Sequence, residues 1–524
     1  MRRAIRAAGF ILLVGIPFFV AGFAVPRLLP ENRPRLFAQV LQRLATDALD
    51  TIPSDTLYEM AARGLVERIG DPYADLYSPE ELAAFARQQI GSQYAGVGMT
   101  IQDQDGAIIV TRVFPNTPAE NTGIIAGDRI LAVDSTTTRG LKVDEVTAML
   151  LGAPGTRVNI TIQRPGVADP IEFGATRAVI TVPAVPFAIM LDGNVGYVPL
   201  QRFNSNAAEE VAAALNRLKA AGAKGFVLDL RGNPGGELDE AVEVADLFLD
   251  GRQEVVRVVY RNQPTDVYES PGRSPITDAP LVVLTDGFSA SASEIVAGAL
   301  QDHDRALVVG TRTFGKGVVQ NVFRLDGGWA LKLTTGRWYT PSGRSIQTAL
   351  QPITRADAIA AQDSSKPRPE FRTDGGRVVY GGGGITPDLQ VRQDSLTPAE
   401  ERLSRALGPA SQQVYNSIYD FARAIRTSVK TDFAPRPEWR REVYDRLVKA
   451  GVTVDSATYA SGGTLIDRLI EQRVANLAFG DSTAFRRSSR FDPPLLRAVE
   501  LLRSTPSQKE LFALAQKQQK AEEN

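Results

Sequence analysis

The sequence predicts a multi-domain α/β protein with helical segments at both ends of the chain. With 524 residues, the chain is longer than one hydrophobic core normally supports. Between residues 181 and 394, long apolar runs alternate with helical patterns, as expected for strands that are buried on both faces of a sheet. Residues 91–180 instead alternate short β-like runs, punctuated by Gly and Pro, with a single helix.

These changes of pattern divide the chain into five expected parts. Before the β-rich part the pattern is helical, with Val40, Leu41 and Leu44 at three- and four-residue spacing and a helix start at Pro79. We expect an N-terminal segment at 1–26, a helical region at 27–90, a β module at 91–180, the α/β core at 181–394 and a helical, charge-rich region at 395–524.

Individual strands are also predicted in the β module and in the core. We expect strands at 99–101, 108–113, 129–133 and 158–163 and a helix at 143–151, followed in the core by strands at 225–230, 280–284 and 306–310.

The N-terminus predicts a membrane anchor. Arg2, Arg3 and Arg6 precede an uncharged stretch at 7–25, which as a helix would span about 28 Å, close to the thickness of a bilayer core. A cleaved signal peptide is the main alternative, although the stretch ends in a poor cleavage site, and a buried core helix is a third interpretation. The arginines favour a cytoplasmic N-terminus. We therefore expect a single anchor at 1–26, with the body on the exported, periplasmic side of a bacterial inner membrane.

Composition excludes several kinds of chemistry. The net charge is −1, so no basic field indicates a nucleic-acid partner. The chain has no cysteine, which excludes disulfides and thiol nucleophiles, and one histidine, His303, which excludes a His-rich metal site. We expect no metal and no cofactor.

Ser291 is the first candidate catalytic residue. A buried strand runs through a tight turn into a helix at this serine, where unpaired N–H groups and the positive end of the helix dipole lie. The N–H of Ala292 can therefore point at a developing oxyanion. Taken alone, however, Ser291 and Glu294 match a capping box, in which the serine only closes the helix end.

Two further motifs accompany this serine. Lys316 lies between glycines after a buried strand, and a lysine can act as a general base if burial lowers its pKa. The sequence Asp-Leu-Arg-Gly-Asn-Pro-Gly-Gly at 229–236 also follows a buried strand, and its glycines allow N–H groups to form an anion-binding concavity. Each motif alone is more often an exposed loop lysine or an ordinary turn.

The four motifs at 229–236, 289–295, 313–320 and 339–347 together resemble the carboxyl-terminal processing peptidases, or tail-specific proteases. The resemblance covers about residues 36–392. It implies a crotonase/ClpP-like α/β core, with Ser291 as the nucleophile, Lys316 as its base, Gln320 orienting the lysine, and Ala292 and Gly235 as oxyanion donors. Gly232 or Gly236 could replace Gly235, and Asp302 is expected to support helix packing.

His303 is not expected to take part in a triad. It lies twelve residues beyond Ser291 on the same predicted helix, about 18 Å away by helical rise. We expect a surface residue at the end of that helix.

Residues 91–180 resemble a PDZ domain of the circularly permuted bacterial kind, inserted in the chain before the core. Gly96, Val97, Gly98 and Met99 stand where such domains place the loop that binds a peptide carboxylate. The resemblance therefore implies that this module binds substrate C-termini.

The expected function is that of a serine endopeptidase that cleaves proteins near their C-termini with a Ser–Lys dyad. A catalytically silent PDZ scaffold and a crotonase-type acyl-CoA enzyme are the alternatives. The helices at 395–524 could dimerise, bind an adaptor or shield the active site. Expected partners are protein or peptide C-termini, the membrane through the N-terminal segment, and a second copy or an adaptor.

Overall fold

The computed structural model describes residues 33–522 in two compact units, one formed by 33–79 with 320–334 and the other by the remaining residues. Short gaps interrupt the description at 90–92, 105, 115–116, 165–166, 168, 262, 274–275, 277, 349–367 and 394–395.

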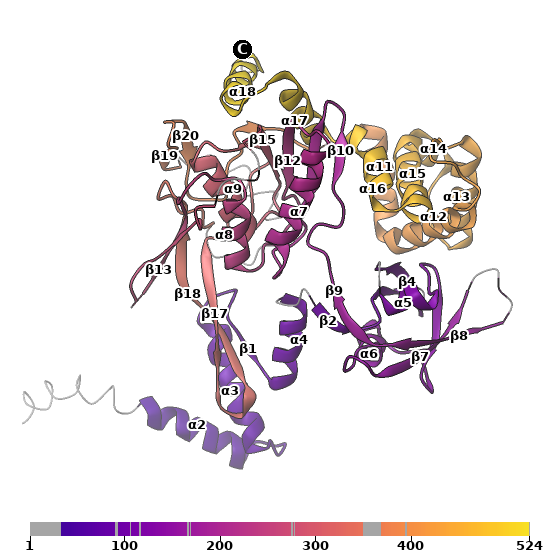
Figure 1. The fold of residues 1–524 in the computed structure, drawn as a ribbon. Helices are drawn as coiled ribbons and strands as arrows, with labels where there is room; N and C mark the ends of the chain where they lie inside the picture. Colours follow the sequence, from indigo (N-terminus) through magenta and orange to yellow (C-terminus); the bar gives the residue numbers. More distant parts are fainter. Residues whose placement is uncertain are drawn as a thin grey trace, which may run out of the picture. The chain divides into compact units, whose positions relative to one another are not determined.

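The centre of the larger unit is a six-stranded sheet in the order β10-β11-β12-β15-β16-β21 (Figure 1). Five of its strands run parallel, and β10 pairs antiparallel with β11. The strands predicted from the apolar runs in the core are confirmed. Their bounds are Ile189–Leu191 (β10), Val195–Pro199 (β11), Gly225–Asp229 (β12), Leu281–Thr285 (β15), Leu307–Gly310 (β16) and Leu389–Gln390 (β21).

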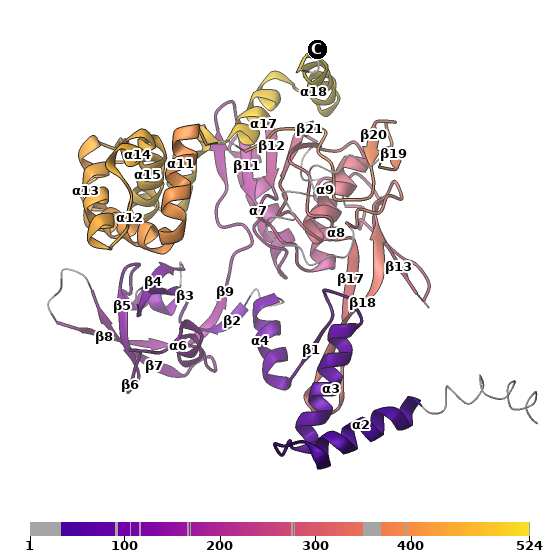
Figure 2. The same cartoon turned by 180° about the vertical axis from the view of Figure 1, so that it is seen from behind.

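Helices cover both faces of this sheet (Figure 2). Side chains alternate between the faces of a strand, so Leu228 packs with one set of helices and Val227 with the other. The first set is α7 (Ala207–Ala220), α8 (Leu238–Asp246) and α9 (Ala292–Asp302), and the second is α17 (Pro493–Ser504) and α18 (Gln508–Glu522). Helices from the far C-terminus therefore complete the core.

The β module forms its own sheet and hydrophobic core. The strands predicted at 99–101, 108–113, 129–133 and 158–163 and the helix at 143–151 are all present, within a few residues of the expected bounds. The module contains β2 (Gln93–Gly96), β3 (Met99–Gln104), β4 (Ala107–Val113), α5 (Pro118–Thr122), β5 (Arg129–Val133), β6 (Thr136–Thr137), α6 (Val143–Leu150), β7 (Arg157–Gln163), β8 (Ile171–Thr176) and β9 (Ala178–Thr181).

A helical bundle follows the core in sequence and has a separate apolar cluster. It consists of α11 (Pro398–Leu407), α12 (Ser411–Ile425), α13 (Pro437–Lys449), α14 (Ser456–Ser461), α15 (Gly463–Phe479) and α16 (Asp481–Ser488). The predicted helical character of this region is confirmed.

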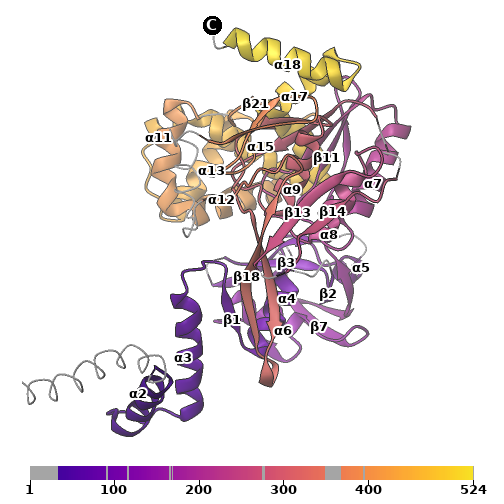
Figure 3. The same cartoon turned by 90° about the vertical axis from the view of Figure 1, so that its left-hand side faces the viewer.

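The smaller unit contains α2 (Arg33–Asp47), α3 (Ser54–Arg68), β1 (Asp75–Tyr77) and residues 320–334 from the hairpin of β17 (Val318–Arg324) with β18 (Ala330–Tyr339) (Figure 3). The region at 27–90 was predicted to be helical, and its described part also contains one short strand, because β1 pairs with β18 and buries Leu76 and Tyr77. A three-residue strand between helices gives too short a pattern to be seen in the sequence.

The predicted anchor at 7–25 lies outside the described residues. A helix needs about 20 apolar residues to span a bilayer. The longest helix among the described residues, α15, has 17 residues in all. Among the helices that the structure describes, none combines the length and the apolar character needed to cross a membrane. The expectation of a single N-terminal anchor, from which the periplasmic location was inferred, is therefore not supported by the part of the chain that the structure describes.

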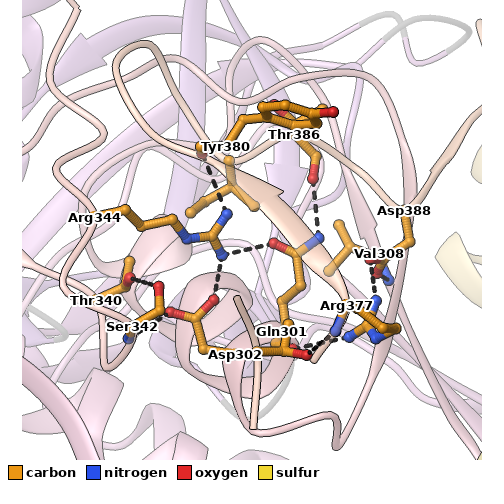
Figure 4. A network of polar contacts seen from close by, with 12 residues as sticks. Gln301, Asp302, Val308, Thr340, Ser342, Arg344, Arg377, Tyr380, Thr386 and Asp388 are labelled. Atoms are coloured by element: carbon orange, nitrogen blue, oxygen red, sulfur yellow. Dashed lines mark hydrogen bonds and ion pairs between the residues drawn. The ribbon is translucent and has the colours of Figure 1, made fainter. Parts of the chain in front are cut away.

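A buried polar network fixes the C-terminal end of α9 (Figure 4). The Arg344 guanidinium donates to Asp302 Oδ1 at 2.5 Å and to Gln301 Oε1 at 2.7 Å. Asp302 Oδ2 also accepts from the Ser342 backbone at 3.0 Å, and both Asp302 and Arg344 are almost completely buried. The network connects α9 to the chain after β18, and it agrees with the packing role expected for Asp302.

Arg344→Ala is predicted to destabilise the protein by about 3–5 kcal/mol, because it leaves the Asp302 carboxylate buried without its cation. Urea unfolding followed by circular dichroism measures this change. Arg446→Ala is the matched control, since Arg446 pairs with Glu442 on a solvent-accessible helix face and little change is expected. Equal effects of the two substitutions would contradict the role of the network.

Candidate active site

Ser291 lies between the end of β15 and the start of α9 in an unusual backbone conformation. Its φ is 56° and its ψ is −115°, whereas an ordinary N-cap residue has β-region angles. A non-glycine residue in this sparsely populated region is strained, and such strain persists only when surrounding contacts hold it. Ser291 is thus more than the simple helix cap that the capping-box pattern alone would suggest.

Two side chains of the turn before Ser291 hold its backbone in place. Asp286 Oδ1 accepts hydrogen bonds from the N–H groups of Phe288 and Ser289, at 2.9 and 3.1 Å. The hydroxyl of Ser289, which is fully buried, donates to Leu230 O at 2.8 Å. These contacts fix the direction in which the chain enters α9.

The glycine-rich turn at 229–236 packs directly against the serine. Gly235 has a φ of 99°, and a Cβ atom there would lie 2.8 Å from Ser291 Cβ and 2.9 Å from Ala292 N. Asn233 O accepts from Ala290 N at 3.0 Å and from Ser293 Oγ at 2.9 Å. Only glycine fits this approach, because any side chain would push the turn away from Ser291.

The candidate oxyanion donors differ in their present bonding. Ala292 is the first residue of α9, and the N–H of a first helical residue has no carbonyl acceptor within its own helix. Gly232 N donates to Asp286 Oδ1 at 3.0 Å, and Gly235 N donates to Asn233 Oδ1 at 2.9 Å. Gly232 or Gly235 can therefore stabilise an oxyanion only if its N–H releases the side-chain oxygen that it binds in this structure and donates to the substrate oxygen instead.

The loop that carries Lys316 follows β16 and is anchored on both sides of the lysine. The Trp338 indole donates to Lys316 O at 3.1 Å, and Gly317 N donates to Gln347 Oε1 at 2.7 Å. Phe314 N donates to Ser289 O at 3.0 Å, which ties the loop to the turn before the serine. Lys316 itself is half-buried.

One buried carboxylate joins the serine and lysine segments. Glu294 Oε2 accepts from Ser291 N and from Lys316 N, each at 2.9 Å. These two nitrogens therefore lie no more than twice 2.9 Å apart. Glu294 Oε1 accepts from Gly315 N at 2.7 Å and from the Thr313 hydroxyl at 2.5 Å. The structure thus brings together the two segments that the sequence separates.

Two opposing effects act on the pKa of Glu294. Complete burial raises the pKa of this carboxyl from 4.5 to about 7, although the four donated hydrogen bonds act to lower it. The folded state therefore binds this proton more tightly than the unfolded chain does. Between about pH 4.5 and 7, this group makes the free energy of unfolding fall as the pH rises.

The predicted peptide-binding loop borders a groove of about 610 Å³ in the β module. Val97, Gly98 and Met99 line it, and Gly96 precedes them at the end of β2. Gly98 has a φ of 86°, and a side chain there would collide with Thr117. The rest of the lining is largely apolar and includes Tyr94, Ile101, Phe114, Leu150, Leu151 and Val182.

Comparisons with known proteins give the family. The pattern of peptidase family S41 matches residues 194–354, and a PDZ domain pattern matches 109–164. The carboxy-terminal processing protease CtpA of Bacillus subtilis is 32% identical over 317 residues, which cover 60% of this chain and 67% of that protein. The carboxy-terminal-processing protease of Bartonella bacilliformis is 38% identical over 317 residues, covering 59% and 72%.

The chain belongs to peptidase family S41, the carboxy-terminal processing serine proteases. Among solved structures, the photosystem II D1 C-terminal processing protease matches with 30% identity and a TM-score of 0.37, over 67% of this chain and 85% of that one. The two family patterns and the sheets of this chain confirm the predicted mixed α/β peptidase with a PDZ domain. The crotonase/ClpP relationship and the permuted order of the PDZ strands remain predictions.

Some residues of this S41 protease were misread or missed in the sequence. Glu294 looked like a capping-box partner, and only its burial reveals its four donors. His303 ends α9 as expected, but it is only partly exposed, because its ring contacts Asp374 Oδ2 and Glu254 O. Gln320 lies in β17, where its amide contacts Thr334 Oγ1 at 3.4 Å, and its role remains a prediction.

Glu294→Gln is predicted to lower peptidase activity by about a hundredfold or more with little change in fold. The amide presents an N–H group where the carboxylate accepted hydrogen bonds, so the serine and lysine segments shift, and small misplacements lower activity by about that factor.

In the unmodified protein, activity should fall as the pH drops through about 7, where Glu294 takes up a proton. The pH dependence of peptide cleavage measures both effects.

Glu400→Gln is the matched control, because Glu400 forms the same capping box with Thr397 at the start of α11. This substitution should leave activity unchanged. An active Glu294→Gln enzyme that keeps the acidic limb of the pH profile would contradict the assigned role.

Proposed function

We propose that this S41 protease cleaves protein substrates near their C-termini by a dyad in which Ser291 is the nucleophile and Lys316 the general base. The shared hydrogen bonding of Ser291 N and Lys316 N to Glu294 Oε2 is the observation that carries the proposal. It holds the backbone of a strained serine at a helix N-terminus close to the backbone of a half-buried lysine.

The reaction proceeds through an acyl-enzyme. The neutral Lys316 amine takes the Ser291 proton as Oγ attacks the scissile carbonyl carbon. The resulting oxyanion accepts the Ala292 N–H and one N–H from the turn at 229–236. The C–N bond then breaks as Lys316 donates its proton to the leaving amine. Water hydrolyses the ester in the same way, and Ser291 regains its proton.

The PDZ domain supplies substrate selection in this proposal. The N–H groups of the loop at 96–99 bind the terminal carboxylate, and the apolar groove accepts the side chain of the last residue. We therefore assign 91–180 to substrate binding and 181–394 to catalysis. Assembly through the helices at 395–524 stays a prediction.

Ser291→Ala and Lys316→Ala are each predicted to abolish cleavage of an unstructured peptide and to leave the melting temperature nearly unchanged. Each removes a group that the chemical step needs, and neither side chain lies in the buried core. Mass spectrometry of the cleaved termini measures activity. The exposed Ser428→Ala and Lys430→Ala serve as controls. Cleavage at the normal rate by either dyad variant would refute the dyad.

Met99→Asp is predicted to weaken binding of a peptide with an apolar C-terminal residue by about tenfold or more. The new carboxylate repels the peptide carboxylate and removes apolar contact from the groove. Fluorescence anisotropy measures the dissociation constant, and Val179→Asp, on an exposed position of β9, is the control. Equal binding of free-acid and amidated peptides by the unmodified protein would contradict carboxylate recognition.

A further inference from the structure

Arg231, at the start of the glycine-rich turn, binds two carboxylates at once. Its guanidinium is 11% exposed and donates to Asp229 Oδ2 at 2.6 Å. It also donates two hydrogen bonds to Asp492, at 2.8 Å to Oδ1 and 2.7 Å to Oδ2. Burial alone would lower the pKa of Arg231, but the two carboxylates outweigh it and the pKa is raised. The guanidinium therefore stays charged and paired.

Asp492 comes from a distant part of the chain, 261 residues after Arg231. It is the N-cap of α17, where its side chain accepts from Leu495 N at 3.2 Å. Because α17 packs on the core sheet, the position of Asp492 beside Arg231 is fixed. It lies outside the residues that match the S41 family pattern, 194–354.

Packing alone does not fix this position. A cavity of about 440 Å³ lies beside the pair, and both Arg231 and Asp492 line it. A side chain next to such a space lacks the dense contacts that normally hold a residue in place. The bidentate ion pair with Asp492 therefore sets the orientation of the guanidinium, since two parallel hydrogen bonds fix its plane.

The Arg231–Asp492 ion pair is connected to Ser291 through the glycine-rich turn at 229–236. The Arg231 backbone N–H donates to Asp229 Oδ1 at 3.0 Å, and the next residue, Gly232, donates to Asp286 at the base of the serine turn. Asn233 O then accepts from Ala290 N, one residue before Ser291. These contacts form a continuous path from Arg231 to Gly235, four residues on, which packs against Ser291.

We propose that Asp492 is a positioning residue, which acts through Arg231 to hold the oxyanion turn at 229–236 against Ser291. The C-terminal region thus contributes to the chemical step and does more than stabilise the fold. This inference rests on the proposed function, because it assigns the turn to oxyanion stabilisation.

The test is Asp492→Asn in the full chain. Asparagine is an equally good N-cap, so α17 keeps its start, but the charge and the bidentate acceptance are lost. We expect kcat for peptide cleavage to fall about ten- to a hundredfold, whereas KM and the dissociation constant of a PDZ-binding peptide stay unchanged. Asp492→Glu, which retains the carboxylate, should recover part of the loss.

Asp455→Asn is the matched control, since Asp455 caps α14 through a hydrogen bond of the same kind, accepting from the N–H three residues on, Thr458 N, at 2.8 Å. It should leave kcat and KM unchanged. A melting temperature lowered in Asp492→Asn with kcat preserved would show that the pair only braces the fold, and this result would overturn the proposal.

Amide hydrogen exchange separates failure of this inference from failure of the proposed function. Asp492→Asn should speed exchange in the peptide covering 229–236, whereas Asp455→Asn should not. Faster exchange in a protein whose unmodified form cleaves no peptide would keep the positioning role and reject the proposed function. Unchanged exchange would reject the positioning role, whatever the activity.

Discussion

The carboxylate of Glu294 is the constraint on which the arrangement of the site depends. It is buried in the first turn of α9 and accepts four hydrogen bonds, two of which come from the backbone of Ser291 and Lys316. Backbone contacts fix a loop more firmly than contacts to a flexible side chain, because fewer torsions lie between the bond and the chain. The segments that carry Ser291 and Lys316 are thereby held to one carboxylate.

Holding these segments together costs stability that the surrounding structure offsets. Ser291 occupies a strained backbone region. Burying a carboxylate also costs folding free energy unless its oxygens accept hydrogen bonds. The helices on both faces of the parallel sheet and the Arg344–Asp302 pair at the other end of α9 supply a rigid support. The contacts of Arg231 with Asp492, at the start of α17, connect this support to the glycine-rich turn at 229–236.

The sequence predicted those features that depend on short-range pattern. Apolar runs located β12, β15 and β16, and the motif resemblance predicted that Ser291 and Lys316 act together. Features that depend on burial or on distant contacts could not be predicted. Glu294 and His303 occupy ordinary helix-end positions in the sequence, and nothing local distinguishes a buried carboxylate from an exposed one. The pairing of Arg231 with Asp492 joins residues 261 positions apart, which no local pattern encodes.

The most direct test of this account is the titration of the Glu294 carboxyl itself. Infrared difference spectra between the protein and Glu294→Gln, recorded from acidic to alkaline pH, isolate the C=O band of this group. The band should disappear with a midpoint near pH 7 as the buried carboxyl ionises, and peptidase activity should appear over the same interval. A carboxyl that titrates near its ordinary value, or activity that is complete while the carboxyl is still protonated, would contradict it.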